Sequence, residues 1–204
     1  MNRALVSNIA LAGWLAADVV RIQIFAGDLG ANLTASWIRW AEMAVLAIAV
    51  VFVLLRPQAL RQDTSPSAIA IAFSATLLPI VYGVAGVHSH LVPMVLAAQA
   101  LAIVLMGSSL LCLRRNFSIL PQYRSVVATG PYRLVRHPIY ASYLLFDGAL
   151  VVGSGSTAGV MLWLAEFGLL AGRAAYEENL LADTDPDYAR YRAAVPWRLV
   201  PYVD

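Results

Sequence analysis

The chain has 204 residues, of which 60% are hydrophobic and only 13% are charged, and its net charge at neutral pH is +2. A soluble domain is closer to half apolar and a quarter charged, so this composition, with a mean hydropathy of +0.71, argues against a water-soluble protein and predicts an integral membrane protein. The small net charge argues against a nucleic-acid partner. The single cysteine, Cys112, cannot form a disulfide within the chain.

Hydrophobic segments long enough to cross a bilayer follow one another through the first half of the chain. A membrane helix needs about 20 apolar residues. Residues 68–87 and 91–113 meet this requirement without a charged side chain, whereas residues 4–25 and 37–55 each contain one acid and one arginine. In both of the latter segments the opposite charges are three residues apart and can pair on one helix face. We therefore predict four membrane helices in this half.

Two shorter apolar segments, residues 139–152 and 157–172, are separated by Gly153-Ser154-Gly155-Ser156. Glycine and serine at this density are typical of a turn, so the two segments predict a tight helical hairpin. The preceding stretch, residues 114–137, contains five arginines and no acid, and the positive-inside rule places it in the cytoplasm together with both termini. The predicted fold is an all-α integral membrane protein of five or six transmembrane helices. A charged cytoplasmic tail, residues 173–204, would be broken into short helices and turns by its prolines.

Polar residues concentrate after position 113, which divides the chain into N-terminal membrane helices, residues 1–113, and a functional core, residues 114–204. Pro138 suits the first position of a helix, and the free N–H groups of that helix would favour an anion such as the carboxylate of an amino-acid-like ligand. Aromatic faces nearby would suit a sulfonium cation. An alternative is a basic membrane anchor with interfacial tyrosines. The side chains concerned are Tyr132, Arg133, Arg136, His137 and Tyr140.

A second polar group lies on the last predicted helix. Helical spacing puts Glu166, Arg173 and Glu177 along one stripe, and Glu178 follows at once. Two adjacent carboxylates beside an arginine can hold the hydroxyls of a ribose or an ammonium group. The alternative is a solvated helix end with one ordinary salt bridge. Asp147 and Glu166 are acids within the predicted hairpin, and their role stays open between function and pairing.

The order of several short motifs resembles one known family. The motifs are Asn116-Phe117-Ser118, Val127-Ala128-Thr129-Gly130-Pro131-Tyr132, Arg136-His137-Pro138-Ile139-Tyr140, Arg173-x3-Glu177-Glu178, and Tyr188-x2-Tyr191 with Val195-Pro196. Together they resemble the isoprenylcysteine carboxyl methyltransferase (ICMT) family, which is related to the membrane phospholipid methyltransferases. The resemblance covers roughly residues 113–202.

The resemblance implies a pocket for S-adenosylmethionine between the cytoplasmic loop, the hairpin and the tail. It implies that Arg173 and Glu178 take part in catalysis, with Arg173 nearest the reacting centre, where it orients the acceptor. The residues that the resemblance assigns to the cofactor site are His137, Pro138, Tyr140, Glu177 and Glu178, with Tyr132, Arg136 and Tyr188 as further walls.

The acceptor is expected to be lipophilic and to enter from the bilayer. An isoprenylcysteine-like carboxylate is favoured, and a phospholipid or a small amine or thiol is the alternative, because Ala194 stands where a basic residue usually precedes the Val-Pro pair. The alternative from another class is a non-catalytic transport or lipid-binding module. No metal is expected, because His88 and His90 have no third ligand. Short loops suggest a bacterial inner membrane.

Overall fold

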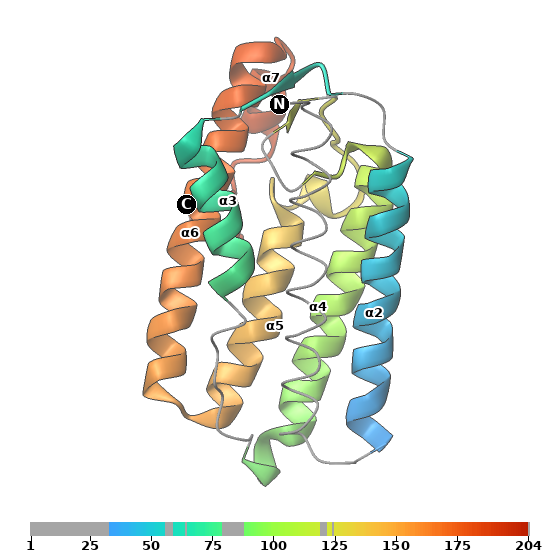
Figure 1. Cartoon of the computed structure of the whole chain (residues 1–204), viewed down its shortest axis with the longest axis vertical. Helices are drawn as coiled ribbons and strands as arrows, with labels where there is room; N and C mark the ends of the chain where they lie inside the picture. Colours follow the sequence, from blue (N-terminus) through green and yellow to red (C-terminus); the bar gives the residue numbers. More distant parts are fainter. Residues whose placement is uncertain are drawn as a thin grey trace.

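The computed structural model describes residues 33–55, 59–63, 65–78, 88–118, 122–123 and 125–203. The span expected at residues 4–25 and much of the one at residues 68–87 lie outside these described residues. Within them, the chain is mostly helical, as Figure 1 shows. The long helices are α2 (Leu33–Leu54), α4 (Val92–Leu113), α5 (Pro138–Ser154) and α6 (Thr157–Thr184).

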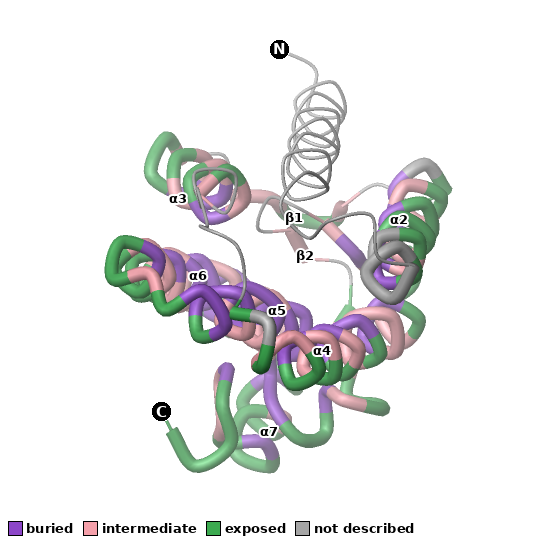
Figure 2. Tube along the Cα trace, turned by 90° about the horizontal axis from the view of Figure 1, so that it is seen from below, coloured by how far each residue is buried: buried purple, intermediate pink, exposed green. Residues whose placement is uncertain are grey.

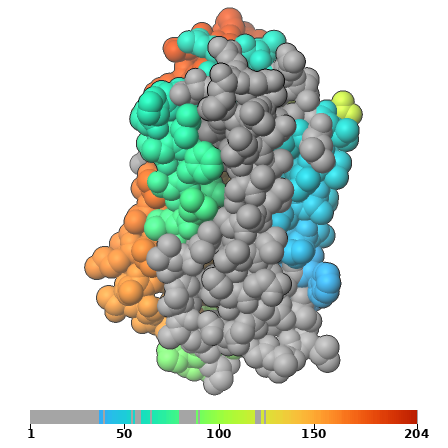
Figure 3. Space-filling model, in the orientation of Figure 1, coloured from blue at the N-terminus to red at the C-terminus, as the bar shows by residue number. Residues whose placement is uncertain are grey.

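The helices form a row in the order α3 (Pro66–Leu77), α6, α5, α4 and α2, since each packs against the next. Figure 2 shows α6, α5 and α4 side by side, with α3 and α2 on one side of them and α7 (Tyr188–Ala194) on the other. In the space-filling view, α3 and α2 form two flanks of one face of the molecule (Figure 3). Buried apolar side chains between the helices form the core, and Leu144 and Leu170 lie in its larger cluster.

Two of the described helices are long and apolar enough to cross a membrane, Val92–Asn116 and Thr157–Thr184. The 22 residues of α4 span about 33 Å at the helical rise of about 1.5 Å per residue, which matches the hydrocarbon thickness. Shorter apolar helices cover Trp40–Val53, Pro66–Leu77 and Pro138–Ser154. An integral membrane protein is therefore confirmed in outline, while the predicted number of five or six spans stays a prediction.

The predicted hairpin is present and tighter than expected. Gly153 and Ser154 still belong to α5, and the chain turns at Gly155, whose φ of 63° is the left-handed conformation that glycine adopts without strain. Ser156 then caps α6, because its hydroxyl accepts a 3.0 Å hydrogen bond from the Gly159 N–H. Trp163 ties the two helices together by donating a 2.9 Å hydrogen bond to the Leu144 carbonyl.

Two details differ from the sequence-based prediction. The helix expected to end at Gly172 continues as α6 to Thr184, so Arg173 lies inside a helix rather than at the start of a tail. The fold is also not purely α. The two-residue strands β1 (Arg61–Gln62) and β2 (Gln122–Tyr123) pair antiparallel, with Arg61 opposite Tyr123. This short ladder joins the connection after α2 to the loop that follows α4.

Candidate active site

Polar side chains gather at one end of the bundle, where α5 begins and α6 ends. α5 starts at Pro138, as predicted, since a proline in the first turn removes an N–H that would have no helical partner. The two residues before it bond to the C-terminal segment: the N–H of Arg136 donates to the Trp197 carbonyl and that of His137 to the Arg198 carbonyl, each at 2.9 Å. The start of α5 and the end of the chain are thus fixed to each other.

Glu178 is the centre of this polar group. Its side chain is only 3% exposed, and Arg136 Nε lies 2.9 Å from its Oε1 atom. Arg198 donates to both carboxylate oxygens, at 3.3 Å each. His137 Nε2 lies 3.1 Å from the same Oε1. A buried carboxylate is tolerated only when it is paired and hydrogen-bonded, and Glu178 meets both conditions.

Glu177, its neighbour, has a different environment. Its side chain is 21% exposed and lines a cavity. The Tyr140 hydroxyl donates a hydrogen bond to its Oε1, and Arg173 Nε donates to the same atom at 3.3 Å. His137 Nδ1 lies 3.6 Å from its Oε2. His137 therefore lies between the two carboxylates, of which one is enclosed and the other open.

Tyr140 is held on both faces of its ring. The His137 ring stacks against it, with centroids 5.3 Å apart and planes 6° from parallel. The guanidinium carbon of Arg173 lies 5.0 Å from the Tyr140 ring centroid, within the range of a cation–π contact. Arg173 Nη2 also donates to the Ser118 carbonyl at 3.4 Å. These contacts leave Tyr140 and Arg173 little freedom, so the Glu177 carboxylate is presented in one orientation.

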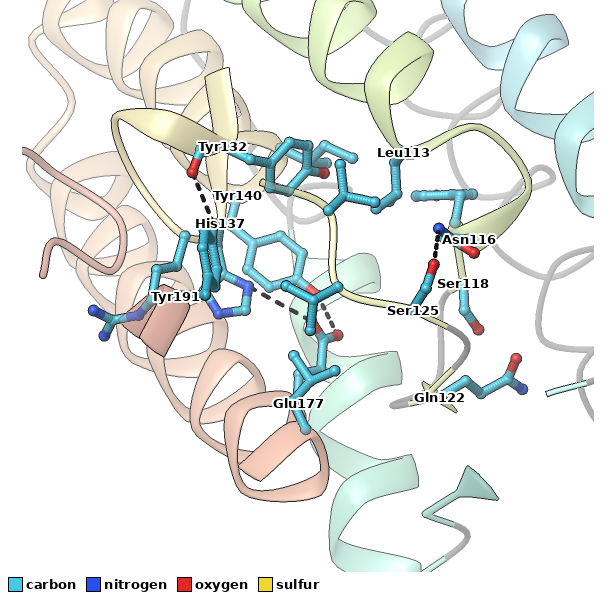
Figure 4. A pocket seen from close by; sticks show the side chains of 16 residues that line it. Leu113, Asn116, Ser118, Gln122, Ser125, Tyr132, His137, Tyr140, Glu177 and Tyr191 are labelled. Carbon is cyan, nitrogen blue, oxygen red and sulfur yellow. Dashed lines mark hydrogen bonds and ion pairs between the residues drawn. The ribbon is translucent and has the colours of Figure 1, made fainter. Parts of the chain in front are cut away.

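A cavity that opens to solvent lies beside these residues, and Figure 4 shows the side chains that line it. Five residues named from the sequence line it: Tyr132, Arg136, His137, Tyr140 and Glu177. Pro138, Arg173 and Glu178 lie behind this wall and contact its members.

Tyr188 is placed apart from this cavity. It is buried in α7 and borders a separate shallow pocket with Asp185 and Arg192. Among the described residues its hydroxyl has no hydrogen-bond partner. Tyr191, from the same helix, lines the cavity instead and donates a 2.8 Å hydrogen bond to the Tyr132 carbonyl. Burial raises the pKa of Tyr191 to about 12 and the pKa of Tyr132 and Tyr188 above the usual range.

The sequence assigned the cytoplasmic loop to the pocket but did not assign the individual residues that form its opposite wall. It comes from the loop after α4 and carries neutral polar side chains: Asn116, Ser118, Gln122 and Ser125. Asn116 donates a 2.9 Å hydrogen bond to the Ser125 hydroxyl. The Ser118 hydroxyl is buried and has no partner among the described residues. The Asn116-Phe117-Ser118 motif was the one sequence signal for this wall. Arg198 carried no signal of its own.

The other polar residues singled out from the sequence lie elsewhere. Asp147 and Glu166 are buried in α5 and α6, about two and three helical turns from the nearest cavity residues of their helices, and both interact with other groups. His88 and His90 stack on each other before α4, with ring centroids 5.9 Å apart. In the described part of the chain, no three potential ligands lie together to hold a metal ion.

Comparison with known proteins agrees with this geometry. Residues 91–183 match the model of the isoprenylcysteine carboxyl methyltransferase (ICMT) family. No curated protein sequence matches the chain. Among solved structures, the chain is similar to the eukaryotic intramembrane Ras methyltransferase ICMT, with 19% sequence identity and a TM-score of 0.55, over 90% of this chain and 68% of that one. At this identity the likeness shows a shared fold.

The family match covers α4, the loop that walls the cavity, the hairpin and both glutamates of the site. It favours an enzyme over the non-catalytic membrane module considered from the sequence. Over residues 91–183, which are less than half of the chain, the sequence therefore resembles the ICMT family of methyltransferases.

Proposed function

We propose that the cavity binds S-adenosylmethionine and that the chain transfers its methyl group to the carboxylate of a lipophilic, isoprenylcysteine-like acceptor. One observation carries the proposal. Of two adjacent carboxylates, Glu177 lines the cavity and is open to it, while Glu178 lies behind the wall and is enclosed by two arginines. Glu178 makes the wall rigid, and Glu177 offers a hydrogen-bond acceptor to a ligand.

The cavity residues fit this cofactor in chemistry. Glu177 would accept hydrogen bonds from ribose hydroxyls or an ammonium group. The buried Ser118 hydroxyl on the other wall lacks a partner among the described residues, and a ligand would supply one. The ring of Tyr132 would face the sulfonium cation.

When bound, the cofactor supplies an electrophilic methyl group on a sulfonium. Transfer of that methyl group to an acceptor carboxylate would give a methyl ester and leave the sulfur as a neutral thioether. An ionised carboxylate needs no general base, so the protein acts by positioning the acceptor and excluding water. In this scheme Arg173 draws the acceptor carboxylate by its charge and orients Glu177, and Glu178 keeps His137 and Arg136 in place.

The proposal extends to topology. The site end of the bundle would face the cytoplasm of a bacterial inner membrane, together with both termini. Exposed apolar side chains along the helices, such as Leu101 and Val104 of α4 and Leu164 of α6, would contact lipid. The greasy tail of the acceptor would enter from that lipid between helices and carry its carboxylate to the cavity.

The test is methyl transfer from labelled S-adenosylmethionine in membranes that contain the protein, followed by separation of lipid, protein and small-molecule fractions. Label in a prenylated-peptide fraction supports the proposed acceptor. Label in phospholipid or in a small amine or thiol fraction would support methyltransferase activity but contradict the proposed carboxylate acceptor. If wild-type protein transfers no more label than Glu177→Gln with every acceptor class, and S-adenosylhomocysteine fails to raise its melting temperature, the proposal is wrong.

A further inference from the structure

The end of the chain, after the site, forms an exposed apolar turn. Val200 and Val203 pair across it, and the Val203 N–H donates to the Val200 carbonyl at 3.1 Å. Tyr202 at its tip is 85% exposed, Val203 56% and Val200 38%. Trp197 packs against Tyr202, with ring centroids 5.2 Å apart. Four large apolar side chains thus gather in seven residues that form no helix.

The backbone of the turn holds Tyr202 outward. Its φ of 67° is a left-handed conformation that disfavours a bulky residue and that glycine or asparagine adopts more readily. The same segment points inward at other positions. Leu199 belongs to the core cluster, and Arg198 bonds to Glu178. Residues of one short segment therefore divide between the interior and an exposed apolar surface.

The position of this turn favours a lipid partner. Figure 2 shows that α7 and the C-terminal end lie outside the row of α4, α5 and α6, on the side away from α3. In Figure 1 the C-terminal end lies below α7, at a level along the bundle that α6, a candidate membrane span, also occupies. A segment that projects sideways from a helix bundle in a membrane is in a position to contact the headgroup layer.

The chemistry of the neighbouring surface agrees with this placement. Leu134, which is 67% exposed, and Arg133 precede the Arg136-His137 pair that bonds to the C-terminal segment. Tryptophan and tyrosine prefer the headgroup layer of a membrane, and an arginine beside them complements lipid phosphates.

We infer that the turn formed by residues 197–203 inserts into the headgroup layer of the bilayer and, through Arg198, holds the methyltransferase site in shape. Lipid contact restricts the motion of the outer side chains of the turn. Because Arg198 donates to Glu178, which bonds to His137, the positions of these two side chains are then restricted as well. The cofactor site is then complete only when the protein lies in a membrane. The coupling of the turn to the cofactor site rests on the proposed function, whereas the insertion of the turn into the membrane does not.

Insertion is tested with full-length protein in vesicles of phosphatidylcholine and phosphatidylglycerol. Cys112→Ser removes the native thiol, and a fluorescent label is attached at Val203→Cys or, as the matched control, at Arg190→Cys on the exposed side of α7. We expect nitroxide-labelled lipids to quench the label at position 203 several-fold more strongly than the label at position 190, and aqueous iodide to do the reverse. Equal iodide quenching at both positions would overturn the inference. So would protection that disappears when the protein is diluted in lipid, since a second copy would then cover the turn.

The coupling to the site is tested with Tyr202→Gly, which removes the aromatic ring and also relieves the left-handed backbone. In vesicles we expect its dissociation constant for S-adenosylhomocysteine to rise several-fold, with wild-type affinity retained by Arg190→Ala. An unchanged dissociation constant, with insertion confirmed by the label, would refute the coupling alone. A wild-type protein that binds no S-adenosylhomocysteine would instead count against the proposed function and leave the insertion result standing.

Discussion

Arg136 and Glu178, which are 42 residues apart in the chain, form a 2.9 Å ion pair with only 3% of each side chain exposed. Arg136 also donates to the carbonyls of Val195 and Pro196, and Arg198 binds the other side of the same carboxylate. Three separate parts of the chain therefore depend on one buried negative charge. The consequences of removing that charge differ from those of changing its neighbour Glu177.

Glu178→Gln is expected to destabilise the whole fold. It leaves Arg136 buried without its counter-charge, and breaking a buried pair by removing one partner costs roughly 3–5 kcal/mol. The melting temperature in mild detergent should fall well below that of wild type. A control is Asp187→Asn, which removes an exposed pair with Arg190 and should leave the melting temperature unchanged. Equal melting temperatures for Glu178→Gln and wild type would contradict the role of Glu178 as the centre of the site.

Glu177→Gln is expected to affect binding more than stability. Its side chain is partly exposed, and a glutamine amide fills nearly the same volume. Loss of a charge-assisted hydrogen bond to a ligand costs about 1.5–3 kcal/mol, which corresponds to a rise of the dissociation constant for S-adenosylhomocysteine by a factor of about 10 or more. Isothermal titration against purified protein measures the change. An unaltered dissociation constant would remove Glu177 from the proposed site.

Tyr140→Phe tests the contribution of the Tyr140 hydroxyl separately from that of its ring. Phenylalanine keeps the stacking on His137 and the contact with Arg173 but loses the hydrogen bond to Glu177. We expect weaker S-adenosylhomocysteine binding, by a factor of about 3–10 for one hydrogen bond, and a small change in melting temperature. Tyr176→Phe, one position before Glu177 and not in the cavity wall, is the matched control. Wild-type affinity for S-adenosylhomocysteine in both variants would contradict a role of the Tyr140 hydroxyl in orienting Glu177.

Alkaline pH should weaken the fold through Tyr191. Burial raises the pKa of this phenol to about 12 in the folded protein, against about 10 in an unfolded chain. Between these values the unfolded state has released a proton that the folded state retains, so the free energy of unfolding falls as pH rises from about 10 to about 12. Chemical unfolding at several pH values should show a smaller loss for Tyr191→Phe than for wild type. The same slope in both proteins would contradict the prediction.

The hairpin offers a paired test of backbone conformation. Gly155→Ala places a Cβ atom on a residue with φ of 63° and 3.3 Å from His88 Nε2, and should destabilise the protein by about 1–2 kcal/mol. Gly168→Ala lies in the interior of α6, with no atom within 4 Å of the new Cβ, and should stabilise the helix by about 0.5–1 kcal/mol. Melting temperatures that move in the same direction for both variants would show that the turn does not control hairpin stability.

The parts of the fold that follow from local sequence were predicted correctly. The apolar segment at residues 91–113 became α4, and Pro138 and Gly155 mark the two ends of α5. The cavity residues Tyr132, Arg136, His137, Tyr140 and Glu177 were named from motifs and lie together. The helix boundaries depend on local periodicity, whereas Glu177 was grouped with residues 132–140 by the family resemblance and not by proximity in the chain.

The features that were missed depend on contacts between distant segments. Strands of two residues have no periodicity, so β1 and β2 could not be recognised before their pairing was known. Ser118 lies at the site through contacts with distant residues, among them a 3.4 Å hydrogen bond from Arg173 Nη2 to its carbonyl. Arg198 is one arginine among several in a polar tail, and its sequence position does not indicate that it reaches Glu178.

The β1–β2 ladder also limits how this protein can be recombined with its relatives. Tyr123 donates a 3.0 Å hydrogen bond to Asp185, and Arg61 donates a 3.4 Å hydrogen bond to Thr184, so both strands are attached to the end of α6. A hybrid that takes its first helices from one relative and its hairpin from another would have to match this junction as well as the helix packing. Sequence exchange would succeed most readily when the segments around Arg61, Tyr123 and Asp185 are transplanted as one unit.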